Sequence, residues 1–188
     1  MNPLSNAGRV LSPDLLTKLV DVHTAPREKG VYAWWFAPGA LPVPTDGYAM
    51  ADGRELLYVG IAPRKPSLAG RESASRLRAR LTTHARKDAS RSTLRLSLGA
   101  LLLDELGLTL GIRSGRLNWG PEGELELTRW MNEHARISWV VDDEPWTLES
   151  ELLAGISLPL NVDGRSDAFA TSLSELRQHL RRDARLKS

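Results

Sequence analysis

Residues 30–36 read GVYAWWF and residues 56–61 read LLYVGI, and these two apolar runs decide the fold. Each run is short and rich in aromatic or β-branched residues, and the segment after each is rich in proline and glycine, which predicts buried strands. Each run carries a tyrosine, Tyr32 or Tyr58, and a phenol on a core strand needs a partner for its hydroxyl group. Either both are amphipathic core residues, or they belong to a site. The arginine-loaded segment that follows favours a site for an anion.

The composition predicts one ordinary globular domain. The chain has 188 residues, of which 41% are apolar and 26% are charged. It contains no cysteine, which excludes disulfides and thiolate zinc sites and fits the reducing cytoplasm, where we expect the protein. The N-terminus lacks the pattern of a secretory signal and no apolar run approaches the length of a membrane span, so we expect no membrane association.

The remaining pattern predicts helices around the strands. A third strand is expected at 137–141, and the first two strands are expected to form an antiparallel hairpin joined by the long loop 37–54. Apolar spacing and end signals predict helices over 13–22, 74–87, 93–106, 125–134 and 145–156, and a capping box at Ser172 and Glu175 predicts a basic C-terminal helix. The stretch 107–123 is left unassigned, and its Trp119 is the best candidate for stacking on a base. The result is a small α/β (α+β) domain.

Charge is unevenly distributed although the net charge is only +2. Ten Lys and Arg residues and two acids lie between Arg64 and Arg95, whereas five acids and no base lie between Asp142 and Glu151. A basic flank suits a polyanion and an acidic cluster suits a divalent cation. The alternative is that both are solvated surfaces.

Five short blocks occur in a fixed order: Gly30-Val31-Tyr32, Tyr58-Val59-Gly60, Leu77-x-x-Arg80-Leu81-x-x-His84, Glu149-x-x-Leu152-Leu153 and Pro159-Leu160-Asn161. Together they resemble the GIY-YIG nuclease superfamily over residues 28–163. The resemblance implies a three-stranded antiparallel sheet flanked by helices. It divides the chain into an N-terminal helical extension (1–27), a catalytic domain (28–163) and a C-terminal basic helix (164–188) that packs on the same domain.

The resemblance also implies roles for six residues. Glu149 would bind one Mg²⁺ or Mn²⁺, Arg80 would contact the phosphate, and Tyr58 or Tyr32 would orient or deprotonate the attacking water. Asn161 would lie at the edge of the site, and His84 matches a position where the family often has His or Tyr. A phenol with a pKa near 10 is a poor base, but we expect Arg80 or the metal to lower the pKa of Tyr58. Each residue also has a structural alternative: core packing for the tyrosines, a solvated helix position for Glu149, helix-surface packing for Arg80 and His84, and a turn for Asn161.

The expected activity is that of a metal-dependent endonuclease acting on nucleic acid, with DNA expected before RNA. Sequence-independent phosphate contacts are expected from the arginines outside the blocks: Arg71, Arg76, Arg78, Arg86, Arg91 and Arg95. The alternative function is a catalytically inert nucleic-acid-binding module of the same fold. The C-terminal helix is a further candidate for docking a protein partner.

Overall fold

The computed structural model describes residues 5–44, 47–66 and 73–187. Its centre is a four-stranded antiparallel sheet with the order β2-β3-β1-β6. The three long strands, β1 (Gly30–Phe36), β3 (Arg54–Ala62) and β6 (Ala135–Val141), confirm the three predicted strands. The expected class is therefore confirmed, although the sheet has four strands rather than three.

The additional strand, β2 (Met50–Ala51), lies inside the segment predicted to be a loop. It pairs with the start of β3 across a tight turn in which Asp52 and Gly53 have φ angles of 49° and 66°. Such positive φ values are typical of hairpin turns. A two-residue strand shows no alternation of side chains, and for this reason the sequence could not reveal it.

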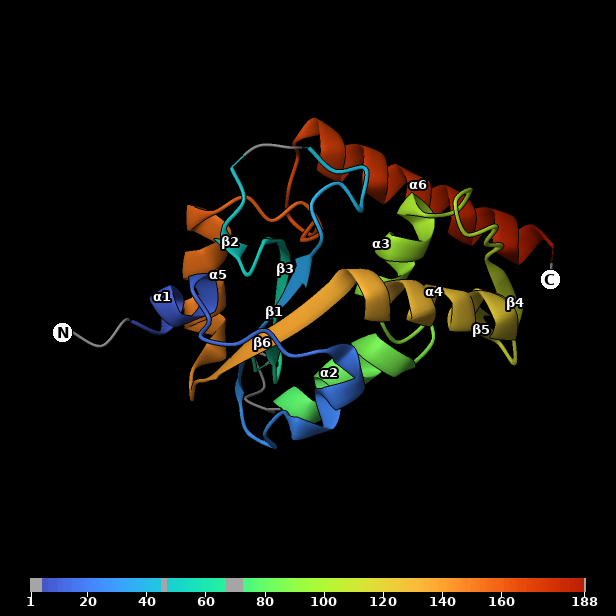
Figure 1. Ribbon diagram of the computed structural model, residues 1–188. Coiled ribbons are helices and arrows are strands. Elements are labelled where there is room, and N and C mark those ends of the chain that lie inside the picture. The colour runs from blue at the N-terminus through green and yellow to red at the C-terminus, as the bar shows by residue number, and fades with distance from the viewer. Residues whose placement is uncertain (1–4, 45–46, 67–72, 188) are drawn as a thin grey trace.

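Helices cover both faces of the sheet (Figure 1). On one face lie α2 (Leu77–Arg86), α3 (Thr93–Leu101) and α4 (Gly120–His134), and on the other lie α1 (Asn6–Leu11) and α5 (Pro145–Gly155). The long α6 (Ala168–Leu186) packs against α3. The predicted second, third and fifth helices are confirmed with shifted ends, since α2 begins at Leu77 and α3 stops at Leu101. No helix in the described ranges is both long and apolar enough to cross a bilayer.

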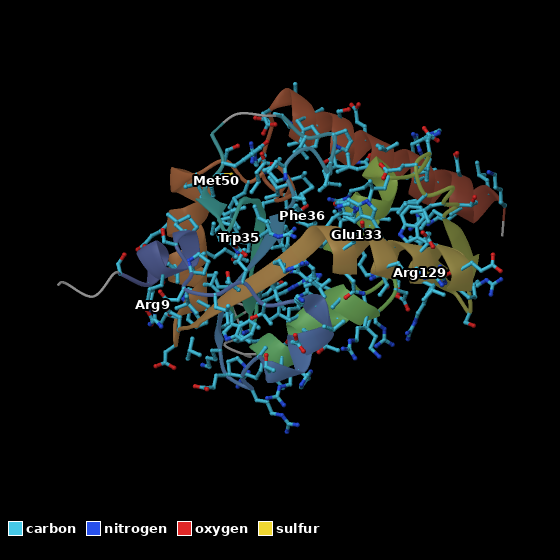
Figure 2. All side chains as sticks on the ribbon, viewed as in Figure 1. Arg9, Trp35, Phe36, Met50, Arg129 and Glu133 are labelled. Carbon is cyan, nitrogen blue, oxygen red and sulfur yellow. The ribbon has the colours of Figure 1, made fainter. Side chains whose placement is uncertain are left out.

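Every residue of β1 is buried, and alternate side chains enter two different cores. Tyr32 and Phe36 face α2, α3 and α4, whereas Val31 and Trp35 face α1 and α5. Figure 2 shows Trp35 and Phe36 among the crowded side chains of the centre, with Met50 towards the periphery. This period-two alternation places Tyr32, but not its neighbours in sequence, on the face that carries the candidate site.

The predicted helix over 13–22 is wrong. The helix α1 instead ends at Leu11, and Thr17 forms two backbone hydrogen bonds with Ile137 of β6, of 2.8 and 2.9 Å. A short 3₁₀ helix, η1 (Leu19–Thr24), follows. The free edge of β6 offers this segment backbone partners, so its apolar residues do not form one helical stripe: Leu19 is buried in the core, whereas Leu15 is 76% exposed.

The start predicted for the C-terminal helix is also wrong, although the helix exists. It begins four residues before Ser172, because the Asp167 side chain accepts a 3.1 Å hydrogen bond from the Ala170 N–H and caps the helix there. Leu173 is buried, and Leu176 and Leu180 pack against the same core. The apolar side of α6 is therefore used within the domain.

The unassigned stretch 107–123 forms a hairpin of β4 (Gly111–Arg113) and β5 (Arg116–Asn118), followed by the first turn of α4. Trp119, between hairpin and helix, is only 3% exposed and packs over Gly99, where an added Cβ would lie 2.3 Å from the indole ring. The prediction that Trp119 stacks on a base is therefore wrong, since the ring belongs to the core.

Candidate active site

The sheet and its helices enclose a pocket of about 380 Å³. Five of the six residues proposed for catalysis line it: Tyr32, Tyr58, Arg80, Glu149 and Asn161. They come from β1, β3, α2, α5 and the loop after α5, so segments separated by more than a hundred residues meet in one place. The sixth, His84, is not among the residues that line the pocket.

Strand pairing explains how the two phenols come together. Tyr32 lies opposite Gly60, and Tyr58 lies opposite Trp34, so the two tyrosines are diagonal neighbours on one face of the sheet. Their ring centroids are 6.4 Å apart. A Cβ at Gly60 would lie 2.4 Å from the Tyr32 hydroxyl oxygen, so the glycine makes the room that this phenol occupies.

Tyr32 is buried and is held from behind by His84. The Tyr32 hydroxyl and His84 Nε2 are 2.8 Å apart, and His84 Nδ1 is 2.7 Å from Ser92 Oγ, which also accepts the Arg95 N–H. Burial, reinforced by Arg80, holds the pKa of His84 well below its usual value, so the imidazole is neutral at neutral pH. His84 therefore lies one residue behind the pocket wall, where it positions Tyr32.

Tyr58 is half-buried and is the phenol with more access to the pocket. Burial raises the pKa of Tyr58, and the nearby Glu149 carboxylate adds to this rise, whereas Arg80 and a hydrogen bond with Thr93 oppose it. Arg80 acts to lower the pKa of Tyr58, as predicted, but burial outweighs it, so the net shift in the protein without ligands is upward. The pKa of Tyr32 is raised well above its usual value for the same reason, with Tyr58 as the second cause.

Glu149 lies in α5, between the buried Leu148 and Leu152, and its half-buried carboxylate faces the pocket. Burial raises the pKa of Glu149, and the positive charge of Arg64 partly offsets this effect. A desolvated carboxylate of this kind gains from a nearby cation. Glu151, two residues further along the helix, is exposed and does not line the pocket.

Asn161 has a structural role beside its place in the pocket, as the alternative of a turn residue suggested. Its Oδ1 accepts the Val59 N–H at 2.9 Å and its Nδ2 donates to the Val59 carbonyl at 2.8 Å. The Leu160 N–H bonds the Leu57 carbonyl at 3.1 Å beside it. The loop after α5 thus pairs with β3 as a short strand would, and it holds the strand that carries Tyr58.

Arg80 is half-buried in α2, and its charge acts on Tyr32, Tyr58 and His84 alike. Its Nη1 donates a long hydrogen bond of 3.5 Å to the Arg91 carbonyl. No described acid forms an ion pair with it within 4.0 Å, so the guanidinium keeps its capacity to bind an anion in the pocket.

The residues proposed for phosphate contacts are scattered. Arg78 and Arg86 donate to the carbonyls of Ala25 and Val20, which ties α2 to the η1 segment, and Arg76 donates to the carbonyls of Ser73 and Ser75. Arg91 is exposed beside a neighbouring groove. Arg71 lies outside the described residues.

Arg95 cannot contact a substrate, so the prediction that it contacts phosphate is wrong. Its side chain is fully buried, and it donates to both the carboxylate and the carbonyl of Glu124, to Thr128 and to the Ala85 carbonyl. It is a structural residue that joins α3 to α4.

The sequence did not single out several further residues that line the pocket: Arg64, Lys65, Thr93, Asp163 and Arg177. Arg64 and Lys65 belong to the basic run already noted, so that signal was available. Arg177 gave no such signal because it lies on α6, after the last of the five sequence blocks. Arg177 is only 8% exposed, and its Nε atom has no hydrogen-bond partner within the described part of the chain.

The profile of the GIY-YIG catalytic domain matches residues 30–182 of the chain. The match covers the pocket and extends through most of α6. Neither the curated proteins nor the solved structures gave a significant match.

Proposed function

The chain belongs to the GIY-YIG nuclease superfamily. On that premise we propose that it is a divalent-metal-dependent endonuclease that hydrolyses phosphodiester bonds and that its first expected substrate is DNA. One observation carries the proposal: four cations and a half-buried carboxylate share a pocket with two phenols. The cations are Arg64, Lys65, Arg80 and Arg177. Such a pocket suits a phosphodiester, whose hydrolysis builds negative charge around phosphorus. A cysteine-free chain is compatible with activity in the cytoplasm, which the proposal includes.

The donors in the pocket fit Mg²⁺ or Mn²⁺. Glu149 supplies a carboxylate that lacks full hydration, and Asp163 is the other acid that lines the pocket. Mg²⁺ needs few protein ligands because it retains water, and the described residues hold no group of three or more His, Cys, Asp and Glu suited to a metal. We assign the ion to Glu149, where it would act as a Lewis acid on the phosphate oxygens.

We assign the remaining roles to other residues of the pocket and its wall. Arg80 grips the scissile phosphate through its planar guanidinium, which can bind two oxygens at once. Tyr58, the phenol with more access to the pocket, orients the attacking water opposite the leaving 3′ oxygen. Tyr32 and His84 fix the other side of the pocket, and Asn161 fixes β3. Because Tyr58 is protonated in the free protein, it can act as a base only after it has released its own proton to solvent, which cations that enter the pocket would favour by lowering its pKa.

A cleavage panel tests the proposal. Supercoiled plasmid, linear duplex, branched DNA and RNA are incubated with the full chain in Mg²⁺, in Mn²⁺ and in EDTA. We expect nicking or cutting of at least one DNA substrate in metal and none in EDTA. Glu149→Gln should abolish it, and Glu151→Gln, a matched change on the exposed side of α5, should not.

Tight DNA binding without cleavage of any substrate in either metal would reject the enzyme and support the inert binding module. Cleavage by Glu149→Gln at the rate of the parent would reject the assigned metal ligand.

A further inference from the structure

A second basic cavity adjoins the candidate pocket. It has a volume of about 370 Å³, and Arg64, Arg80 and Thr93 line both cavities. The charged residues that line it are all arginines: Arg64, Arg80, Arg91, Arg116, Arg181 and Arg185. Within the described ranges no acid lines it. We call this cavity the arginine groove.

The helix α6 connects the two cavities. Arg177 lines the pocket, and Arg181 and Arg185, four and eight residues later, line the groove. Residues spaced by four lie along one face of a helix, so the three guanidinium groups form a stripe about 12 Å long along the axis. Arg181 is close enough to lower the pKa of Arg177, although burial of Arg177 is the larger cause.

The hairpin supplies the opposite wall. It packs against α6 through β4, and β5 contributes Arg116. Like charges at a spacing of four destabilise a helix, and gathering six guanidinium groups around one cavity adds to that repulsion. A bound polyanion would offset this cost, which is the physical reason to look for a ligand here.

We infer that the arginine groove binds the sugar-phosphate backbone of the polynucleotide next to the phosphate that is cut. The inference rests on the proposed nuclease function for the identity of its substrate. The stripe is long enough for about three successive phosphates of one strand. Among the described residues no aromatic side chain lines the groove, so it holds phosphates rather than stacked bases, and its contacts are independent of base sequence.

The test measures binding of a fluorescent DNA duplex by anisotropy over a salt series, without metal and in the Glu149→Gln background so that no cleavage occurs. The groove variant is Arg116→Gln/Arg181→Gln. The control is Arg113→Gln/Arg182→Gln, which removes the same charge from the same hairpin and helix at residues that do not line the groove. We expect the groove variant to bind about tenfold more weakly, with the slope of log affinity against log salt reduced by about two, and the control to keep its slope.

Arg116→Lys/Arg181→Lys keeps the charge and should keep most of the slope, which separates a lost phosphate contact from a misfolded hairpin. Equal weakening in the groove and control variants, or parental binding by the groove variant, would overturn the inference. A second readout is hydrolysis of bis(p-nitrophenyl) phosphate, a diester too small to reach the groove. The groove variant with Glu149 intact should hydrolyse it at the parental rate.

The two proposals fail in distinguishable ways. Absence of cleavage of every DNA and RNA substrate rejects the nuclease but leaves the binding difference to decide the groove. Normal hydrolysis without a binding difference rejects the groove alone.

Discussion

Two buried arginines of this molecule have opposite surroundings. Arg95 is fully enclosed, and it donates to the Glu124 carboxylate and to three other oxygen acceptors on α2 and α4. Arg177 is also buried, but its Nε has no partner among the described residues, and its other contacts are long: 3.4 Å to Ser97 and 3.9 Å to the exposed Asp163. A buried charge whose bonds are complete holds a fold together, whereas one whose bonds are incomplete and which faces a pocket is available to a ligand.

Substitution of Arg95 tests this comparison and should have the largest effect on stability. Arg95→Met should lower the free energy of unfolding by about 3 kcal/mol or more, because Glu124 is left without its ion-pair partner. The measurement is urea unfolding, with exposed Arg91→Met as control. The fraction that remains folded should cleave at the parental rate. A stable Arg95→Met protein that has lost only cleavage would make Arg95 a functional residue.

Glu149→Gln should lower cleavage without loss of stability, the reverse of the effect expected for Arg95→Met. We expect cleavage to fall by about 10²- to 10³-fold while the free energy of unfolding stays constant or rises slightly, because burial already disfavours the Glu149 carboxylate. Single-turnover cleavage and urea unfolding are measured on the same preparation. Parallel loss of stability and activity would indicate a structural carboxylate.

Arg177→Gln should lower cleavage by about 10- to 100-fold, since a guanidinium contact to a phosphate is worth about 1.5–3 kcal/mol. Stability should change little, because the bonds of the Arg177 side chain are already incomplete. The matched measurement is Arg182→Gln on the same helix, which should cleave normally. Destabilisation of the size seen for Arg95→Met would erase the difference between the two arginines.

The smallest effect concerns His84 and pH. Its pKa is lowered on folding, so between that value and the unfolded value near 6.5 the unfolded chain binds more protons. Stability should therefore fall as pH drops below about 6.5, and His84→Gln should flatten this dependence. The raised pKa of Glu149 has the opposite effect: just above its unfolded value of 4.5, the free energy of unfolding falls as pH rises. Urea unfolding of His84→Gln and of Glu149→Gln over a pH series separates the two contributions. An unchanged profile in His84→Gln would show that the imidazole is not buried neutral.

The sequence predicted much of the fold because the strands and most helices carry strong local patterns. Residues 30–36 and 137–141 are apolar and β-branched or aromatic, and the predicted start of α3 at residue 93 follows the capping Ser92. The helix over 13–22 failed because the edge of β6 competes for the backbone of Thr17, a tertiary effect that no local pattern records.

The site was partly predictable for a related reason. Tyr32, Tyr58, Arg80 and Glu149 sit in recognisable blocks, and the structure brings them to one pocket. Arg95 and Arg177 were indistinguishable from surface arginines in the sequence, because the burial and partners of an arginine depend on which helices pack together. The same limit applies to Trp119, which looks like a loop residue until α3 covers it.

Arg80→Lys tests the central claim, that this pocket is where a phosphodiester is cut. The measurement is single-turnover cleavage of a labelled duplex at saturating protein, with DNA affinity determined in parallel without metal. Lysine keeps the charge but cannot grip two oxygens, so we predict a rate about 10²-fold lower with nearly unchanged affinity. Cleavage by Arg80→Lys at the parental rate would contradict the account.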